Sequence, residues 1–307
     1  MMETIIKVGN LVKYFGTVRA VDGISFEVMR GEIFGLLGPN GAGKTTTLEI
    51  IEGLQKPTSG HTVVLGFNTH REGEKLKERI GVQLQAAAYF EQLTLVEILD
   101  LFGKFYPTRV MPRELLAKVN LLDKAKATIG TLSGGQQQRF TIAAALVNDP
   151  EIVFLDEPTT GLDPQARRSL WEFIQQIHSE GKTVVLTTHY MEEAQSLCQR
   201  VAIIDLGRIV AIDTPTNLIH SLPTPYRIKI IANTSLPLEE LSCLEGVKEV
   251  IASDDNNYLL TSIDASGSLS TLLSWVRKKD ITLEHIEVIP ATLEEVFLAL
   301  TGKQLRD

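Results

Sequence analysis

The sequence predicts an α/β fold with a mainly parallel sheet, followed by a small α+β domain. Apolar runs of strand length alternate with helical segments as far as residue 211, and a glycine-rich loop joins one such run to a helix. The proline-containing segment 221–225 then precedes a second series of strands and helices. We therefore expect one domain at residues 1–221 and another at residues 222–307.

The first elements are short stretches in which apolar and polar residues alternate as they do in strands, at residues 5–8, 18–21 and 24–28. They predict an antiparallel subdomain ahead of the glycine-rich loop. Between the first two stretches lie Tyr14 and Phe15. An aromatic ring here either packs against the protein or stacks on a base, and the residues alone favour packing.

The glycine-rich loop has the spacing of a phosphate-binding loop, and it stands between the apolar residues 33–37 and the periodic residues 47–51. Its glycines let backbone N–H groups and the positive end of the next helix surround polyphosphate oxygens. Lys44 adds a positive charge, and Thr45 offers a hydroxyl group to the accompanying magnesium ion. The loop comprises Gly38, Pro39, Asn40, Gly41, Ala42, Gly43, Lys44, Thr45 and Thr46.

In the middle of the domain, the sequence predicts a strand at residues 80–85 and a helical insert at about residues 86–130. Gln85 ends the strand, where a polar side chain can reach a ligand beyond the carboxyl edge of a sheet. Ser133 and Gln136 have capping-box spacing, yet the Ser-Gly-Gly start of a helix also forms an anion site. The residues leave both explanations open.

Two predicted apolar strands each end beside ionisable residues. The first, residues 151–156, ends with Asp156 and continues into Glu157, which can hold magnesium and accept a proton from water. The second, residues 183–188, is followed by His189. A single histidine at a strand end is usually a surface residue, so a functional role for it depends on which residues surround it. A hairpin at residues 201–211 completes the domain.

The C-terminal domain has the element order βαββαβ, which predicts a ferredoxin-like arrangement without identifiable chemistry. A last helix begins with a capping box at Thr292 and Glu295 and ends at Gly302. The strands are expected at residues 226–232, 247–252, 258–263 and 282–289, and the two intervening helices at residues 236–245 and 268–279.

Composition limits the classes of partner. The net charge of -8 argues against a general electrostatic attachment to nucleic acid or anionic lipid. No apolar run reaches the roughly 20 residues that cross a bilayer, and the first residues lack the layout of a secretory signal. Cys198 and Cys243 stand singly, which suits a reducing compartment and predicts small buried side chains. We expect a cytoplasmic protein that does not bind nucleic acid.

Together, and in this order, the motifs resemble those of the ATP-binding subunit of an ABC transporter over residues 5–218. The resemblance implies a P-loop ATPase of ABC type, in which two subunits enclose two ATP molecules. The matching motifs are the Walker A loop at residues 38–46, the Q-loop Gln85, the signature at residues 132–136, the Walker B strand at residues 152–156 with Glu157, the D-loop at residues 161–164, and the switch residue His189.

The resemblance also implies a role for each residue. Glu157, His189 and Gln85 would act in catalysis, and Thr45, Gln85 and Asp156 would serve magnesium. The Walker A residues would hold the phosphates of the nucleotide, and Ser133, Gly134, Gly135 and Gln136 of the opposite subunit would complete the site. Asp163 would also contribute to the nucleotide site and would couple the two halves. Phe15 would stack on the adenine, with Tyr14 as the alternative.

Residues 191–194 and 290–302 resemble the drug-resistance and nodulation-type exporters, whose permease is a separate chain. The implied partners are a second ATPase subunit, most simply an identical one, and an integral-membrane permease that holds the protein at the inner face of the membrane. Residues 86–106 stand where relatives receive a permease helix, although their apolar residues fit an insert core equally well. Ala144 and Asp213 depart from the pattern, which usually has arginine and glycine there.

Two other functions are compatible with an ATPase of this type. A soluble ABC-type ATPase acting on ribosomes, DNA or iron–sulfur assembly would show tandem domains, a coiled-coil insertion or a basic face, and the sequence has none of these. A regulator without turnover would lack Glu157 or an intact signature, and both are present.

Overall fold

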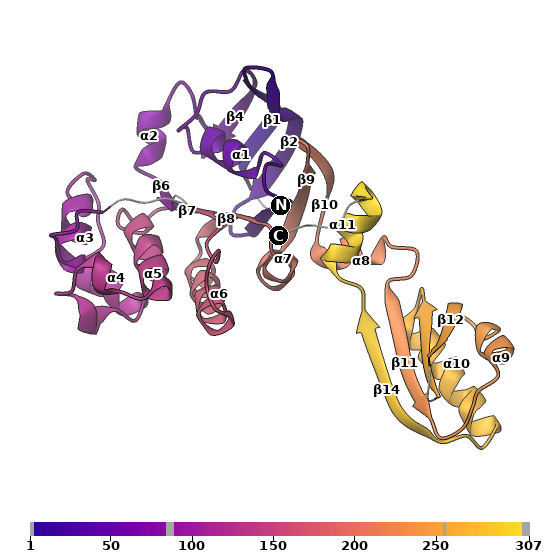
Figure 1. Cartoon of the computed structure of the whole chain (residues 1–307). Coiled ribbons are helices and arrows are strands. Elements are labelled where there is room, and N and C mark those ends of the chain that lie inside the picture. The colour runs from indigo at the N-terminus through magenta and orange to yellow at the C-terminus, as the bar shows by residue number, and fades with distance from the viewer. Residues whose placement is uncertain (1–2, 84–88, 254–255, 303–307) are drawn as a thin grey trace. The chain divides into compact units, whose positions relative to one another are not determined.

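The computed structural model describes residues 3–83, 89–253 and 256–302. The chain divides into two compact units after Thr214, ahead of the predicted boundary at residue 221 (Figure 1). The boundary differs because α8 (Pro215–His220) packs against α11 (Leu293–Thr301) of the second unit. The described part of the chain contains no helix that is both long and apolar enough to span a membrane.

The first unit is organised around a six-stranded sheet in the order β10-β9-β3-β8-β7-β6. All neighbouring strands are parallel except the hairpin of β9 and β10, as the sequence predicted. Every residue of β3, β7 and β8 is buried, which is typical of parallel strands covered on both faces. The strands are β3 (Ile33–Leu37), β6 (Ile80–Gln83), β7 (Ile152–Asp156), β8 (Thr183–Thr188), β9 (Arg200–Asp205) and β10 (Arg208–Asp213).

The predicted antiparallel subdomain is present as a four-stranded sheet in the order β2-β1-β4-β5. The prediction of three short strands was wrong, because β1 and β2 are 12 residues each. Register shifts interrupt the alternation in both strands. One, between Val8 and Leu11 with Asn10 at φ 45°, follows the predicted part of β1, and another, with Gly23 at φ 77°, separates the two pieces predicted within β2. The strands are β1 (Thr4–Phe15), β2 (Val18–Met29), β4 (Ser59–Val64) and β5 (Phe67–Asn68).

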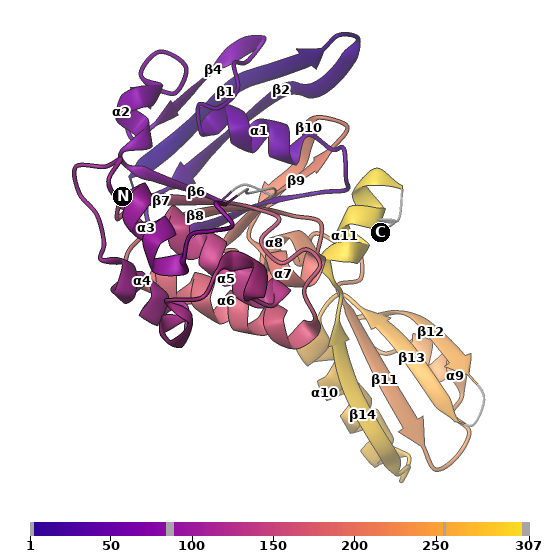
Figure 2. The same ribbon diagram turned by 60° about the vertical axis from the view of Figure 1, so that its left-hand side comes forward.

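Helices cover both faces of the six-stranded sheet (Figures 1 and 2). On one face, α1 (Lys44–Ile51) lies between the two sheets and shares one apolar core with both. On the other face lie α5 (Gly134–Ala145), α6 (Pro164–Ser179) and α7 (Met191–Leu197). The helical insert contains α3 (Leu95–Gly103), α4 (Pro112–Lys118) and the 3-10 helices Leu122–Lys124 and Ile129–Thr131, and α2 (Gly73–Lys77) precedes β6.

The second unit has the predicted order βαββαβ, and its sheet order is β12-β13-β11-β14 with antiparallel pairs. It has a core of its own. The capping box of Thr292 and Glu295 and the C-terminal Gly302 of α11 are present as predicted. Cys243 is exposed, so the prediction of two buried cysteines holds only for Cys198. The elements are β11 (Tyr226–Ala232), α9 (Leu238–Ser242), β12 (Val247–Ser253), β13 (Asn257–Ser262), α10 (Ala265–Lys278) and β14 (Leu283–Pro290).

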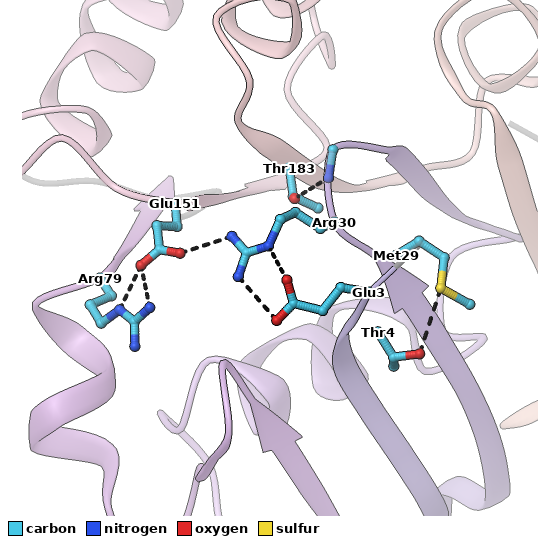
Figure 3. Close-up of polar contacts among 8 residues, drawn as sticks. Glu3, Thr4, Met29, Arg30, Arg79, Glu151 and Thr183 are labelled. Carbon is cyan, nitrogen blue, oxygen red and sulfur yellow. Dashed lines mark hydrogen bonds and ion pairs between the residues drawn. The ribbon is translucent and has the colours of Figure 1, made fainter. Parts of the chain in front are cut away.

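The amino ends of the parallel strands carry a network of ion pairs (Figure 3). Arg30, which lies between β2 and β3, donates to Glu3 at 2.6 Å and to Glu151 at 2.9 Å. Glu151 precedes β7 and also accepts from Arg79, which precedes β6, at 2.6 Å. All four side chains are at least one-third exposed, so water weakens these ion pairs.

Candidate functional site

The phosphate-loop motif occupies the connection between β3 and α1, at the carboxyl edge of the parallel sheet. Gly38 and Gly43 allow this connection to pass close to neighbouring backbone. A Cβ atom at Gly38 would lie 2.2 Å from the carbonyl oxygen of Ile204, and one at Gly43 would lie 2.2 Å from that of Ala20. Gly43 also has φ 100°, a left-handed conformation that favours glycine. The remaining loop residues are Pro39, Asn40, Gly41 and Ala42, and Thr45 and Thr46 lie in the first turn of α1.

Lys44 is the buried cation of the loop, with 4% of its surface exposed. Its Nζ atom donates to the carbonyl oxygens of Gly38 at 2.9 Å and Pro39 at 3.2 Å, and lies 3.2 Å from Oε1 of Glu157. Burial lowers the pKa of Lys44, and the carboxylates of Glu157 and Asp156 oppose part of that shift. The loop therefore presents a positive charge in a region of restricted solvation, where it acts strongly on an anion.

Asp156 ends β7 beside the loop. Its Oδ1 atom accepts hydrogen bonds from the hydroxyl groups of Thr45, at 3.2 Å, and of Thr187. Thr187 pairs directly with Asp156 in the register of β7 and β8. Sequence reasoning missed Thr187, although a polar residue at the end of the neighbouring strand was a usable signal. The hydroxyl of Thr45 and the carboxylate of Asp156 are hard oxygen donors that fit Mg²⁺, which uses few protein ligands beside substrate phosphates.

Glu157 lies between two basic side chains. Its Oε1 faces Lys44, its Oε2 lies 3.3 Å from Nδ1 of His189, and Thr160 donates to Oε2 at 3.2 Å. Its backbone has φ 47°, which is uncommon for a residue other than glycine, and its N–H donates to Thr187 at 2.9 Å. Burial opposes the charge, but Lys44 and His189 hold the pKa of Glu157 below the ordinary value of a glutamate. Glu157 is thus ionised at neutral pH and able to orient water or accept a proton.

A second group forms where two helices begin. Ser133 caps α5: its Oγ accepts from the Gln136 N–H at 3.4 Å, and its own N–H donates to Oε1 of Gln136 at 3.0 Å, which confirms the predicted capping box. Asp163 caps α6 by accepting from the N–H groups of Gln165 and Ala166. Both helix starts line one hollow of about 230 Å³, together with Gly134 and Gly135. Two positive helix ends open onto this hollow, an arrangement that favours an anion.

The predicted residues therefore fall into two groups. The first contains Lys44, Thr45, Asp156, Glu157 and His189; the second contains Ser133, Gly134, Gly135, Gln136 and Asp163. Among the residues that the structure describes, no hydrogen bond or ion pair joins one group to the other.

Gln85 and the aromatic pair were also predicted at the site. Gln85 lies outside the described residues, so its predicted place at the site is not tested. Phe15 and Tyr14 are 46% and 38% exposed, and basic side chains lie over both rings. Because consecutive strand residues point to opposite faces, only one of them can stack on a given base.

Comparison with known proteins identifies the family. The model of the family described as "ABC transporter" matches residues 21–160. The chain is 38% identical to the linearmycin resistance ATP-binding protein LnrL of Bacillus subtilis, over 97% of this chain and 98% of that protein. It is 39% identical to the Nod factor export ATP-binding protein I of Paraburkholderia xenovorans, over the full length of both chains. The daunorubicin resistance ATP-binding protein DrrA3 of Streptomyces coeruleorubidus is 36% identical over 100% of this chain and 98% of its own.

Solved structures agree with these relatives. A dimeric post-hydrolysis state of the ATP-binding cassette MJ0796 bound to ADP and Pi has a TM-score of 0.62 at 29% identity, over 68% of this chain and 98% of that chain. The cbiO1 protein of Clostridium perfringens, part of the transporter complex cbiONQ, has a TM-score of 0.64 at 27% identity, over 71% and 92%. The loop geometry, the acidic strand end and these matches lead to one conclusion: the chain belongs to the ABC transporter family, as an ATP-binding subunit with ATPase activity.

Proposed function

We propose that two copies of this chain close around two ATP molecules and that hydrolysis drives a membrane permease carried on a separate chain. The main support for this proposal is that one chain carries two separate surfaces suited to binding phosphate. Lys44 and Glu157 form one, and the hollow of Ser133 and Asp163 forms the other. A two-fold dimer places each hollow of one copy against the loop of its mate, so that two complete sites form from four halves.

The chemistry proposed for each site is in-line transfer of the γ-phosphoryl group to water. Lys44 and the N–H groups of residues 41–46 hold the phosphates, and Glu157 orients the attacking water and accepts its proton. His189, whose Nδ1 atom lies 3.3 Å from Glu157, would contact the γ-phosphate. Thr45 and Asp156, with Gln85 on sequence grounds, would hold Mg²⁺, which neutralises phosphate charge when bound.

The opposite copy completes the site in this proposal. Ser133, Gly134, Gly135 and Gln136 approach the γ-phosphate, and Asp163 links the two copies. These roles are supported by the fact that all five residues line one hollow at the starts of α5 and α6.

The names of the relatives support an export function. They refer to export of Nod factor and to resistance to linearmycin and daunorubicin, over at least 97% of this chain. We propose that this chain serves a drug, lipid or other small molecule, from the inner face of the cell membrane through its permease. The net charge of -8 favours a protein or small-molecule partner over nucleic acid.

The variant Glu157→Gln tests this proposal. Without the carboxylate, hydrolysis should fall by roughly 10²- to 10⁴-fold while ATP binding persists. ATP should then hold the variant as a dimer with twice the 33.9 kDa mass of one chain, measured by light scattering. Glu151→Gln is the matched control, because it makes the same change at the amino end of β7. Near-normal hydrolysis, or a strictly monomeric ATP-loaded variant, would contradict the proposal.

A further inference from the structure

The two groups of site residues are connected by side chains of α6 and of the segment between β8 and α7. Arg167 lies one turn into α6, and its N–H donates to the carbonyl oxygen of Asp163 at 2.9 Å. The Cζ atom of Arg167 lies 4.3 Å from the centroid of the Tyr190 ring. The Tyr190 ring packs against that of His189, with centroids 4.1 Å apart. A series of contacts therefore leads from the cap of α6 to the imidazole beside Glu157.

The backbone folds so that these two consecutive rings meet. In an extended strand, neighbouring side chains would point to opposite faces. Here β8 ends at Thr188, whose hydroxyl accepts a hydrogen bond from the Tyr190 N–H at 2.9 Å. A hydroxyl that accepts from the backbone two residues further on stabilises a turn. The chain turns at this point, and the rings of His189 and Tyr190 lie against each other at 42°.

A buried hydrogen bond joins α7 to α6 one turn further along each segment. The indole N–H of Trp171 donates to Oε1 of Glu193 at 3.1 Å, and Glu193 is fully buried. Trp171 follows Arg167 by four residues, and Glu193 follows Tyr190 by three, so both pairs have helical spacing. Burial raises the pKa of Glu193, and the nearby charge of Arg167 opposes part of that shift. The ring contact is thus held by a second contact beside it.

The guanidinium group of Arg167 faces the tyrosine ring in a partly buried position. Its Nε atom is buried and has no hydrogen-bond partner among the described residues. Leaving such a donor unpaired is costly, and attraction to the electron-rich face of an aromatic ring offsets part of that cost. Arginine suits this arrangement because its planar group stacks on rings. The arrangement fixes the position of Tyr190 more than packing alone would.

We propose that Arg167 and Tyr190 are positioning residues for His189. Arg167 holds the tyrosine ring, and the ring holds the imidazole in the orientation that places its Nδ1 atom 3.3 Å from Glu157. Without the ring, the histidine side chain would sample other rotamers, and a small displacement of a reacting group lowers the rate strongly. Neither positioning residue touches the nucleotide. This inference rests on the proposed function, since it requires His189 to act in hydrolysis.

The test is a double-variant cycle on the full chain, with hydrolysis measured in single turnovers so that slow variants can be compared. Tyr190→Leu removes the ring and should lower the hydrolysis rate about ten-fold, with the affinity for ATP unchanged. Tyr190→Phe keeps the ring and should stay within about two-fold of the wild type. In a His189→Ala background, Tyr190→Leu should have no further effect, because the group that the ring positions is absent.

Arg167→Met is the second variant, and it replaces Tyr190→Leu in the cycle if that variant does not fold. It removes the guanidinium group and should slow hydrolysis about three-fold, again only when His189 is present. Arg168→Met is the matched control. It removes the same charge from the next position of α6, which is exposed, and should leave hydrolysis unchanged.

Three outcomes would overturn the inference: normal hydrolysis by Tyr190→Leu, equal slowing by Tyr190→Phe, or a loss in Tyr190→Leu that is the same with and without His189. ATP-dependent dimerisation and the rate of His189→Ala are measured on the same preparations. If His189→Ala hydrolyses ATP as well as the wild type does, the proposed role of His189 fails and this inference fails with it. If His189→Ala is slow and dimerisation is intact while the effects are additive, this inference alone fails.

Discussion

The two edges of the six-stranded sheet are built on the same strands, but they hold charge differently. At the carboxyl edge, the side chains of Lys44 and Glu157 lie 3.2 Å apart and are 4% and 8% exposed. At the amino edge, Arg30 and Glu151 lie 2.9 Å apart, but 41% and 35% of their side chains are exposed (Figure 3). Water screens the second pair far more than the first. Burial, rather than distance, separates the functional pair from the structural one.

The strand β7 contains this contrast within a few residues. Glu151 precedes it in an exposed network, whereas Glu157 follows it with φ 47° and with Lys44 and His189 beside it. An uncommon backbone conformation at a buried charged residue is the kind of strain that accompanies function. The variants below separate chemical roles from structural ones.

Ser133 gives the largest expected effect among them, because it is both a helix cap and a proposed phosphate ligand. Aspartate caps helices as well as serine does, so Ser133→Asp should keep the stability of α5. Its charge would face the phosphates of the opposite copy, and hydrolysis should fall by about 100-fold or more. Steady-state ATPase assays and denaturant unfolding measure the two properties.

Thr292→Ala is the control for that experiment. It breaks the same kind of capping box in α11, so it should cost about 1 kcal/mol of stability and leave hydrolysis unchanged. If Ser133→Asp hydrolyses ATP as well as the wild type does, Ser133 is only a cap.

The aromatic pair at the end of β1 gives an intermediate effect. A ring stacked on a base contributes roughly 1–3 kcal/mol, so Phe15→Ala should raise the KM for ATP about ten-fold. Tyr14→Ala is the matched variant, because its ring points to the opposite face of the strand and is similarly exposed. The reverse result would assign the adenine contact to Tyr14.

The smallest expected effect comes from a variant at the amino edge of the sheet. Glu151→Gln removes the carboxylate shared by Arg30 and Arg79, and should lower the free energy of unfolding by about 1 kcal/mol or less. Partial burial opposes the charge of Glu151, but the two guanidinium groups hold its pKa below the ordinary value of a glutamate. The contribution is therefore present at neutral pH and is lost as the pH falls through that lowered pKa. A large loss of ATPase activity in this variant would remove the contrast between the edges.

Local patterns predicted most of the fold and the chemistry-bearing residues. The phosphate loop, the capping box of Ser133 and the acidic end of β7 depend on neighbours in sequence, and all are present. The lengths of β1 and β2 were missed because register shifts near Asn10 and Gly23 break their alternation.

Contacts between distant segments could not be predicted in the same way. Thr187 reaches Asp156 only because β8 lies beside β7 in one register. Glu52 follows α1, where the sequence alone suggests an exposed polar residue, yet only 1% of its surface is exposed.

The central claim is that each ATP site combines the loop of one copy with the Ser133 hollow of the other, and mixing two inactive variants tests it most directly. Lys44→Ala and Ser133→Asp should each be inactive alone. A mixed dimer has one site with both defects and one intact site, so an equal mixture should recover up to about a quarter of wild-type hydrolysis. If mixed dimers form, as energy transfer between labelled chains would show, and hydrolysis stays at the level of the single variants, the shared site is contradicted.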